Sequence, residues 1–194
     1  MKPRPTYRSG RMLPSLAAML LIAAAVGGPS AIARLASSQH AEIKFVATQA
    51  EVPIEGEFKR FSADVDFDPA KPSFGKVDIA IELASVNTGS TDADEMLKSR
   101  DFFDAAHFPR ATFTSASIVA MGAGKFQARG QFALKGRSIA LAIPFAARAE
   151  GAGQWFEGSV PVSRLGYKVG EGEWSDTGTL ADEVLVKFKL YVPR

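Results

Sequence analysis

The stretch that decides the fold is residues 126–145, FQARGQFALKGRSIALAIPF. Up to Leu134 every second residue is apolar or glycine, and from Ile139 to Phe145 a second apolar stripe occupies every second position. Side chains of a strand point alternately to opposite faces, so each half predicts a strand with one apolar, buried face. Gly136 lies in the short connection and can adopt positive φ, which predicts an antiparallel hairpin.

The same alternation recurs along most of the chain. Further one-sided stripes run through residues 61–67, 77–83, 156–162 and 184–192, with shorter candidates at residues 43–46 and 112–119. Turns rich in glycine and proline separate the stripes, as in Met121-Gly122-Ala123-Gly124. About eight strands, each with one solvent-exposed and one buried face, predict an antiparallel all-β barrel or sandwich.

One segment breaks the period of two and predicts a short helix over residues 91–98. Acidic residues gather at its start and a basic residue ends it, as the helix dipole favours. Ser90 or Thr91 can cap its first turn. The helix leads into Phe102 and Phe103, and two adjacent rings cannot both face the core of one strand. We therefore expect one ring to plug a barrel end.

Residues 1–33 have the three-part pattern of a secretory signal peptide. Basic residues precede an apolar run over residues 12–26, and the small residues Ala31 and Ala33 occupy the two positions that a signal peptidase recognises. The apolar run is shorter than the roughly 20 residues of a membrane-spanning helix. We expect a periplasmic protein whose residues 34–194 form one domain. An uncleaved N-terminal anchor is the alternative.

The charge balance argues against a nucleic-acid partner. The chain carries 23 basic and 21 acidic residues, and four of the basic residues lie in residues 1–33, which leaves 19 basic and 21 acidic residues in the remainder. The basic surplus therefore belongs to the signal segment, and no nucleic acid is expected to bind.

Composition also disfavours metal and cofactor chemistry. The chain has no cysteine, which excludes disulfides and thiolate ligands, and its two histidines are His40 and His107. No nucleophile elbow, phosphate loop or dinucleotide-binding motif occurs. We expect no metal site, no cofactor and no catalysis. His107, close in sequence to Asp101 and Asp104, is the one candidate acid–base group.

Large and small residues alternate on the inward stripes, as Ala128, Gly130 and Phe132 illustrate. Such a pattern fits a solidly packed interior. It fits a lumen equally well, because an eight-stranded barrel is just wide enough for either arrangement. The pattern leaves both open. A lumen would have hydrocarbon walls and an apolar ligand.

A set of short motifs is spread over residues 41–193. They are Phe67-Asp68-Pro69, Ser85-Val86-Asn87-Thr88-Gly89, Asp94-Glu95-Met96-Leu97-Lys98-Ser99, Asp101-Phe102-Phe103-Asp104, Phe108-Pro109, Thr112-Phe113-Thr114-Ser115, Gly130-Gln131-Phe132, Leu134-Lys135-Gly136 and Asp182-Glu183-Val184. Together these motifs resemble the YceI-like family of periplasmic polyisoprenoid-binding proteins. The chain departs from the family pattern at Met96, where histidine is common, and at Arg100, where proline is common.

The resemblance implies an eight-stranded, lipocalin-like antiparallel barrel with an elongated apolar pocket. Its implied function is the transport or storage of an isoprenoid lipid, such as a quinone tail or a prenyl phosphate, without catalysis. The mouth is expected near residues 91–104 and 166–178. The expected ligand contacts are Phe61, Val65, Phe67, Phe103, Phe113, Phe126, Phe132, Leu134, Leu141, Phe145, Phe156, Val160, Trp174, Val186 and Phe188.

Alternative functions come from two other features. The stretch Gly170-Glu171-Gly172-Glu173-Trp174 resembles a branch of the family often found beside b-type cytochrome membrane proteins. This implies an accessory module for a membrane electron-transfer partner. A lipid-modifying enzyme that uses His107 is the other alternative. A homodimer is also left open.

Overall fold

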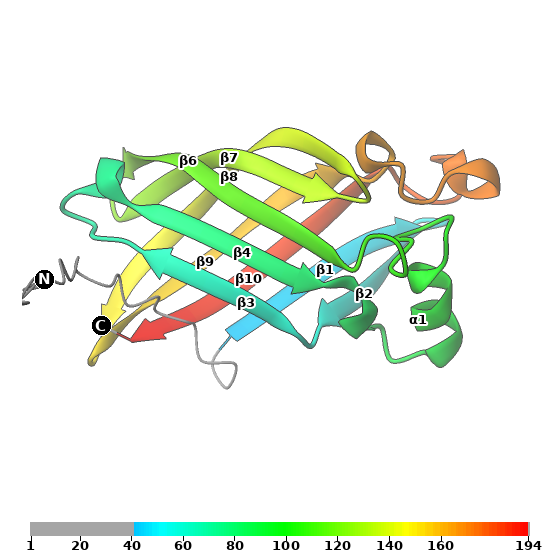
Figure 1. Ribbon diagram of the computed structural model, residues 1–194, viewed down its shortest axis with the longest axis horizontal. Coiled ribbons are helices and arrows are strands. Elements are labelled where there is room, and N and C mark those ends of the chain that lie inside the picture. Colours follow the sequence, from blue (N-terminus) through cyan, green and yellow to red (C-terminus); the bar gives the residue numbers. More distant parts are fainter. Residues whose placement is uncertain (1–40, 194) are drawn as a thin grey trace, which may run out of the picture. The chain divides into compact units, whose positions relative to one another are not determined.

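The strands of the computed structural model, which describes residues 41–193, form one antiparallel sheet (Figure 1). They are β1 (Ala41–Gln49), β2 (Val52–Phe58), β3 (Phe61–Asp66), β4 (Lys76–Glu82), β5 (Val86–Asn87), β6 (Arg110–Gly122), β7 (Lys125–Leu134), β8 (Arg137–Glu150), β9 (Gly153–Ser163) and β10 (Glu183–Pro193). The helical elements are α1 (Thr91–Lys98), η2 (Pro72–Phe74), η3 (Leu83–Ser85), η4 (Leu165–Tyr167) and η5 (Gly172–Ser175). Over these residues, no helix has both the length and the apolar character needed to cross a bilayer.

The sheet curls into a barrel that closes through one bent hairpin. Its strand order is β3-β4-β6-β7-β8-β9-β10-β1-β2-β5. The strand β2 pairs with β5 at one end of this order, and β3 pairs with β4 at the other end. Because β2 continues into β3 and β4 continues into β5, the two pairs are the two halves of one bent hairpin. At the bend, the Lys59 amide donates to the Ser85 carbonyl at 3.0 Å and the Glu82 amide to the Arg60 carbonyl at 3.0 Å. The predicted antiparallel barrel is therefore confirmed.

The sheet has ten strands, and the prediction of about eight missed two of them. The strand β5 is only two residues long, too short for any alternation to show. The strand β2 carries Gly56 on its inward side, where the ring of Phe45 leaves no room for a side chain. A Cβ at this position would lie 2.3 Å from the Phe45 ring. Glycine interrupts the apolar stripe there, which hides the strand in the sequence.

The predicted hairpin of residues 126–145 is formed by β7 and β8. Phe126 lies opposite Phe145, and Leu134 lies opposite Arg137, with two residues between the strands. Both turn residues have positive φ, 47° at Lys135 and 73° at Gly136. Positive φ at both positions is typical of the type I′ turn, whose twist matches that of the strands. The ring of Phe108 also packs over Gly136 and occupies the space of a side chain.

The predicted helix is confirmed as α1. The Ser90 hydroxyl caps it by accepting a hydrogen bond from the Ala93 amide at 3.4 Å. The Asp94 carboxylate accepts hydrogen bonds from the amide and the hydroxyl of Thr88, at 2.7 and 2.8 Å, which fixes the helix against the end of β5. Lys98 completes the predicted charge pattern through an ion pair with Glu95.

The two ends of the barrel differ in what covers them. In Figure 1, α1 and the segment between β9 and β10 lie at one end, and the β3–β4 and β6–β7 connections lie at the other. Buried side chains form two clusters: one includes Leu83, Phe102 and Tyr167, and the other includes Ile118 and Leu190. The first cluster extends to the α1 end, because Phe102 and Tyr167 belong to the segments that cover it.

Candidate functional site

A cavity of about 320 Å³ lies inside the barrel. Its wall draws on most of the strands, and α1 contributes Ala93, Met96 and Leu97. Among the described residues that line it, the polar side chains are Gln49, Thr88 and Arg164, together with the indole of Trp174. All other lining side chains are hydrocarbon or thioether. The interior is therefore partly hollow, and its wall matches a lumen with an apolar ligand.

Most of the residues predicted to contact a ligand line this cavity. They are Val65, Phe103, Phe113, Phe132, Leu134, Leu141, Phe145, Phe156, Val160, Trp174, Val186 and Phe188. Apart from Phe103 and Trp174, which lie outside the strands, the period-two pattern placed them correctly, and their side chains point inward as expected. Their role in binding stays a prediction.

Phe61, Phe67 and Phe126 do not line the cavity. Phe67 follows the last residue of β3 and turns its ring into the far end of the barrel. Its ring centroid lies 4.9 Å from that of Phe126 and 5.4 Å from that of Phe145, both edge to face. These rings, with Phe156, close the end away from α1. Phe61 packs against both core clusters.

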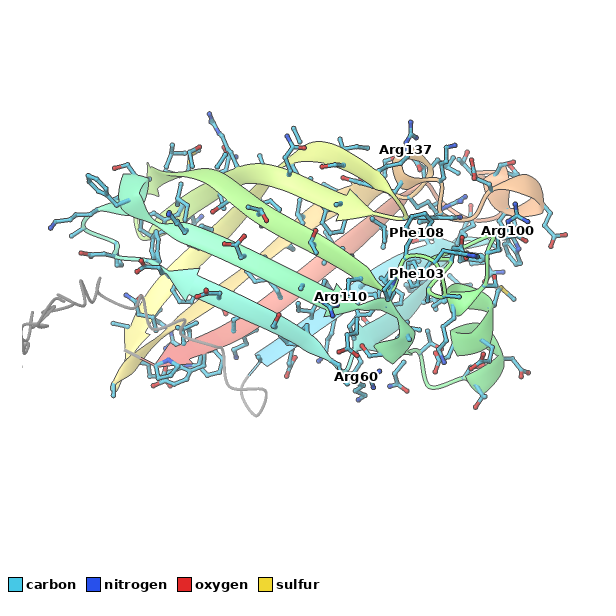
Figure 2. The ribbon with its side chains drawn as sticks, viewed as in Figure 1. Arg60, Arg100, Phe103, Phe108, Arg110 and Arg137 are labelled. Atoms are coloured by element: carbon cyan, nitrogen blue, oxygen red, sulfur yellow. The ribbon has the colours of Figure 1, made fainter. Side chains whose placement is uncertain are left out.

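Phe102 and Phe103 both line the cavity at the α1 end, whereas we expected only one of them to plug a barrel end. The segment that follows α1 is a series of turns, so the alternation of a strand does not apply to it. Phe102 is buried against Trp174, with ring centroids 5.6 Å apart. Phe103 packs against Phe58 at 5.9 Å, and Figure 2 shows it beside α1. The predicted mouth region therefore forms one end of the cavity wall.

Arg164, which follows β9, organises the segment that covers this end, and the sequence analysis missed it. The side chain is buried, and burial lowers the pKa of its guanidinium. Its N–H groups donate to five main-chain carbonyls, those of Ala181, Val169, Gly170, Trp174 and Leu180, at 2.6–3.0 Å. Arginine has five N–H donors, so all of them are used. No sequence signal identifies it, because its partners are backbone atoms.

Gln49 is a second lining residue that the sequence analysis missed. It is the last inward position of β1, after Ile43, Phe45 and Ala47, and all four line the cavity. The inward stripe of β1, extended by two residues beyond Ala47, would have found it.

The candidate acid–base pair lies outside the cavity. His107 Nδ1 and Asp104 Oδ1 are 2.8 Å apart, but the His107 side chain is 75 % exposed and neither residue lines the wall. Over residues 41–193 no group of three or more histidine, aspartate or glutamate side chains is arranged to hold a metal ion.

Comparison with known proteins gives a family and three informative likenesses. The family model described as a YceI-like domain matches residues 36–192. A UPF0312 protein of Shewanella sp. (strain ANA-3) is 33% identical over 146 residues, which cover 70% of this chain and 76% of the relative.

Solved structures share the fold. The crystal structure of BcnA from Burkholderia cenocepacia superposes with a TM-score of 0.79 at 38% identity, covering 80% of this chain and 98% of that one. A polyisoprenoid-binding domain from Saccharophagus degradans superposes with a TM-score of 0.65 at 15% identity, covering 82% of this chain and 97% of that one. At that identity the likeness to the Saccharophagus domain shows the fold alone.

Proposed function

The chain belongs to the YceI-like domain family, and we propose that its cavity binds the chain of a long isoprenoid lipid for transport or storage, without chemical conversion. The observation that carries the proposal is the hollow, hydrocarbon-walled interior between the α1 end and the rings of Phe145 and Phe156. Its volume falls within the range of roughly 300–1,000 Å³ for ligand pockets. The polyisoprenoid-binding domain with the same fold adds support.

Burial of hydrocarbon supplies enough free energy for such binding. Each buried CH₂ group contributes about 0.8 kcal/mol, so a few isoprene units give on the order of 10 kcal/mol before the cost of ordering the chain. A wall of hydrocarbon side chains makes no directional demand along the tail. Selection among lipids then rests on the length of the cavity and on the few polar groups at its mouth.

The proposal involves no chemical conversion, because the described cavity wall offers one hydroxyl side chain, Thr88, which the Asp94 carboxylate holds at the α1 end. Among the described lining residues there is no histidine, serine, aspartate or glutamate that could serve as a nucleophile or general base. The Asp104–His107 pair, whose histidine is exposed, does not line the cavity. A lipid-modifying enzyme is thus the weaker reading.

The proposal places the protein in the periplasm, on the strength of the signal pattern in residues 1–33, which lie outside the described residues. A membrane cytochrome-type partner is the remaining alternative function. Trp174, the residue that suggested it, packs against Phe102 and lines the cavity, and this position favours the lipid-binding proposal.

The test is extraction of the full chain, produced with its own N-terminal segment in a bacterium that makes isoprenoid quinones. Organic extraction followed by mass spectrometry is expected to recover a prenyl lipid in amounts comparable to the protein. An Ala128→Phe variant, purified in parallel, places a ring in the cavity and is expected to be empty, which separates bound lipid from carried-over membrane. Protein that is repeatedly empty and takes up no added quinone would overturn the proposal.

A further inference from the structure

The polar groups at the cavity mouth determine which headgroup a bound lipid can carry. This inference rests on the proposed function, because it concerns the ligand of the same cavity. Lipids with an isoprenoid tail end either in an uncharged group, such as a quinone ring or an alcohol, or in a phosphate. The two differ in what the protein must supply, since an anion buried without a cation is strongly disfavoured.

The one cation of the described cavity wall has no donor left for a phosphate. All five N–H groups of Arg164 donate to main-chain carbonyls of the segment that covers the α1 end. Turning the guanidinium toward a ligand would leave those buried carbonyls unsatisfied. Arg164 therefore holds the mouth in shape and does not present its charge to the cavity.

The second polar group, Thr88, is backed by a negative charge. Its hydroxyl lies 2.8 Å from Asp94 Oδ1, and its main-chain amide donates to the same oxygen at 2.7 Å. The hydroxyl proton is thereby committed to the carboxylate. An incoming phosphate at this position would also meet the charge of Asp94, and like charges repel.

Gln49 is the polar group that stays available. Main-chain hydrogen bonds on both sides hold its backbone, from the Ala50 amide to the Thr179 carbonyl and from the Ala181 amide to the Thr48 carbonyl, each at 2.9 Å. Its half-buried side-chain amide lines the cavity and makes no hydrogen bond within residues 41–193. An amide offers both donors and an acceptor without charge, which suits a carbonyl or a hydroxyl.

We infer that the lipid held by this cavity carries an uncharged headgroup with a carbonyl or hydroxyl, and that the Gln49 amide contacts it at the mouth. A prenyl phosphate is excluded from the same position because the wall formed by residues 41–193 has no free cation to meet it. A competing phosphate site would have to use cations outside the wall. Arg100 is exposed at the α1 end (Figure 2), and Lys98 is paired with Glu95 at 2.9 Å.

The test compares a C20 prenyl alcohol with its monophosphate, so that the two ligands differ only in the headgroup. Both displace a fluorescent isoprenoid probe from the purified protein, and a prenylquinone serves as a second uncharged ligand. The wild-type protein is expected to bind the uncharged ligands at least tenfold more tightly than the phosphate. Gln49→Ala is expected to weaken the uncharged ligands by roughly 2–10-fold, the loss of one hydrogen bond.

Two further variants sharpen the result. Gln49→Lys supplies the missing cation and is expected to shift the preference toward the phosphate. Arg100→Ala, a surface control, is expected to change neither affinity. Equal affinity of the wild-type protein for alcohol and phosphate, or a loss of phosphate binding on Arg100→Ala, would overturn the inference alone. Failure of all the ligands to bind would overturn the proposed function and the inference with it.

Discussion

Replacement of Ala128 by phenylalanine separates a hollow barrel from a filled one. Ala128 is 3 % exposed on β7 and lines the cavity, so the new ring has space to enter. Burying a phenylalanine side chain contributes about 1.5–3 kcal/mol to stability, so we expect the free energy of unfolding to stay unchanged or to rise by up to that amount. In a filled interior the same change would cost about 1–3 kcal/mol through overpacking.

The matched control is Ala63→Phe. Ala63 is 1 % exposed on β3 and, like Ala128, belongs to the core cluster around Ile118, but unlike Ala128 it does not line the cavity. Its ring has no space, so we expect a loss of about 1–3 kcal/mol. The two variants thus introduce the same side chain at buried alanines and are expected to move stability in different directions.

The ring at position 128 also obstructs a bound lipid. If it takes the place of about one isoprene unit, five carbons lose their burial, which amounts to about 4 kcal/mol or roughly a thousandfold in affinity. Urea unfolding measures the first effect and displacement of a fluorescent isoprenoid probe measures the second. Destabilisation of Ala128→Phe to the extent seen for Ala63→Phe, or lipid binding that matches the wild type, would refute the reasoning.

Three further substitutions test other parts of the account. The Phe132 ring lines the cavity and lies 5.2 Å from the Tyr167 ring, so Phe132→Asp buries a carboxylate there and is expected to abolish lipid binding or folding, measured by probe displacement and circular dichroism. Its control, Phe74→Asp at a position 80 % exposed, should behave as wild type. Arg164→Lys keeps the charge but leaves buried carbonyls of residues 165–181 without donors, and each unsatisfied carbonyl costs about 1–3 kcal/mol of stability. Amide hydrogen exchange in this segment should therefore accelerate while the barrel strands keep their protection, and unchanged exchange would show that Arg164 does not hold the segment. His107→Ala removes an exposed imidazole that pairs with Asp104, so it should alter stability by less than about 1 kcal/mol and leave lipid binding intact. A lipid-converting activity that is lost in this variant would favour the enzyme alternative.

Local patterns predicted the parts of the fold that depend on local rules. Alternation and the positive φ available at Gly136 sufficed for the β7–β8 hairpin, because both are properties of a few adjacent residues. The acidic start and the Ser90 cap sufficed for α1 in the same way. Strand β2 was not predicted, because Gly56 interrupts its apolar stripe. The glycine leaves room for the ring of Phe45 on the neighbouring strand, and such a contact between strands is not visible in the local sequence.

The site was predictable as far as it follows the strands. Inward residues such as Phe132 and Val160 line the cavity because alternation fixes their direction. The expected mouth region and ligand class came from the family resemblance, and both stay predictions. Arg164 was beyond reach, because the carbonyls that it binds are brought together only by the folded segment between β9 and β10. Phe67 was assigned to the wall because nothing local shows that β3 ends one residue before it.

The central claim is that the apolar cavity inside the barrel binds a prenyl chain. A crystal structure of the protein with a C20 prenyl alcohol tests this claim most directly. The account predicts continuous density for the chain from beside Gln49 to the rings of Phe145 and Phe156, with the barrel strands unmoved. An interior closed by its own side chains, with the alcohol absent or bound on the outer surface, would contradict it.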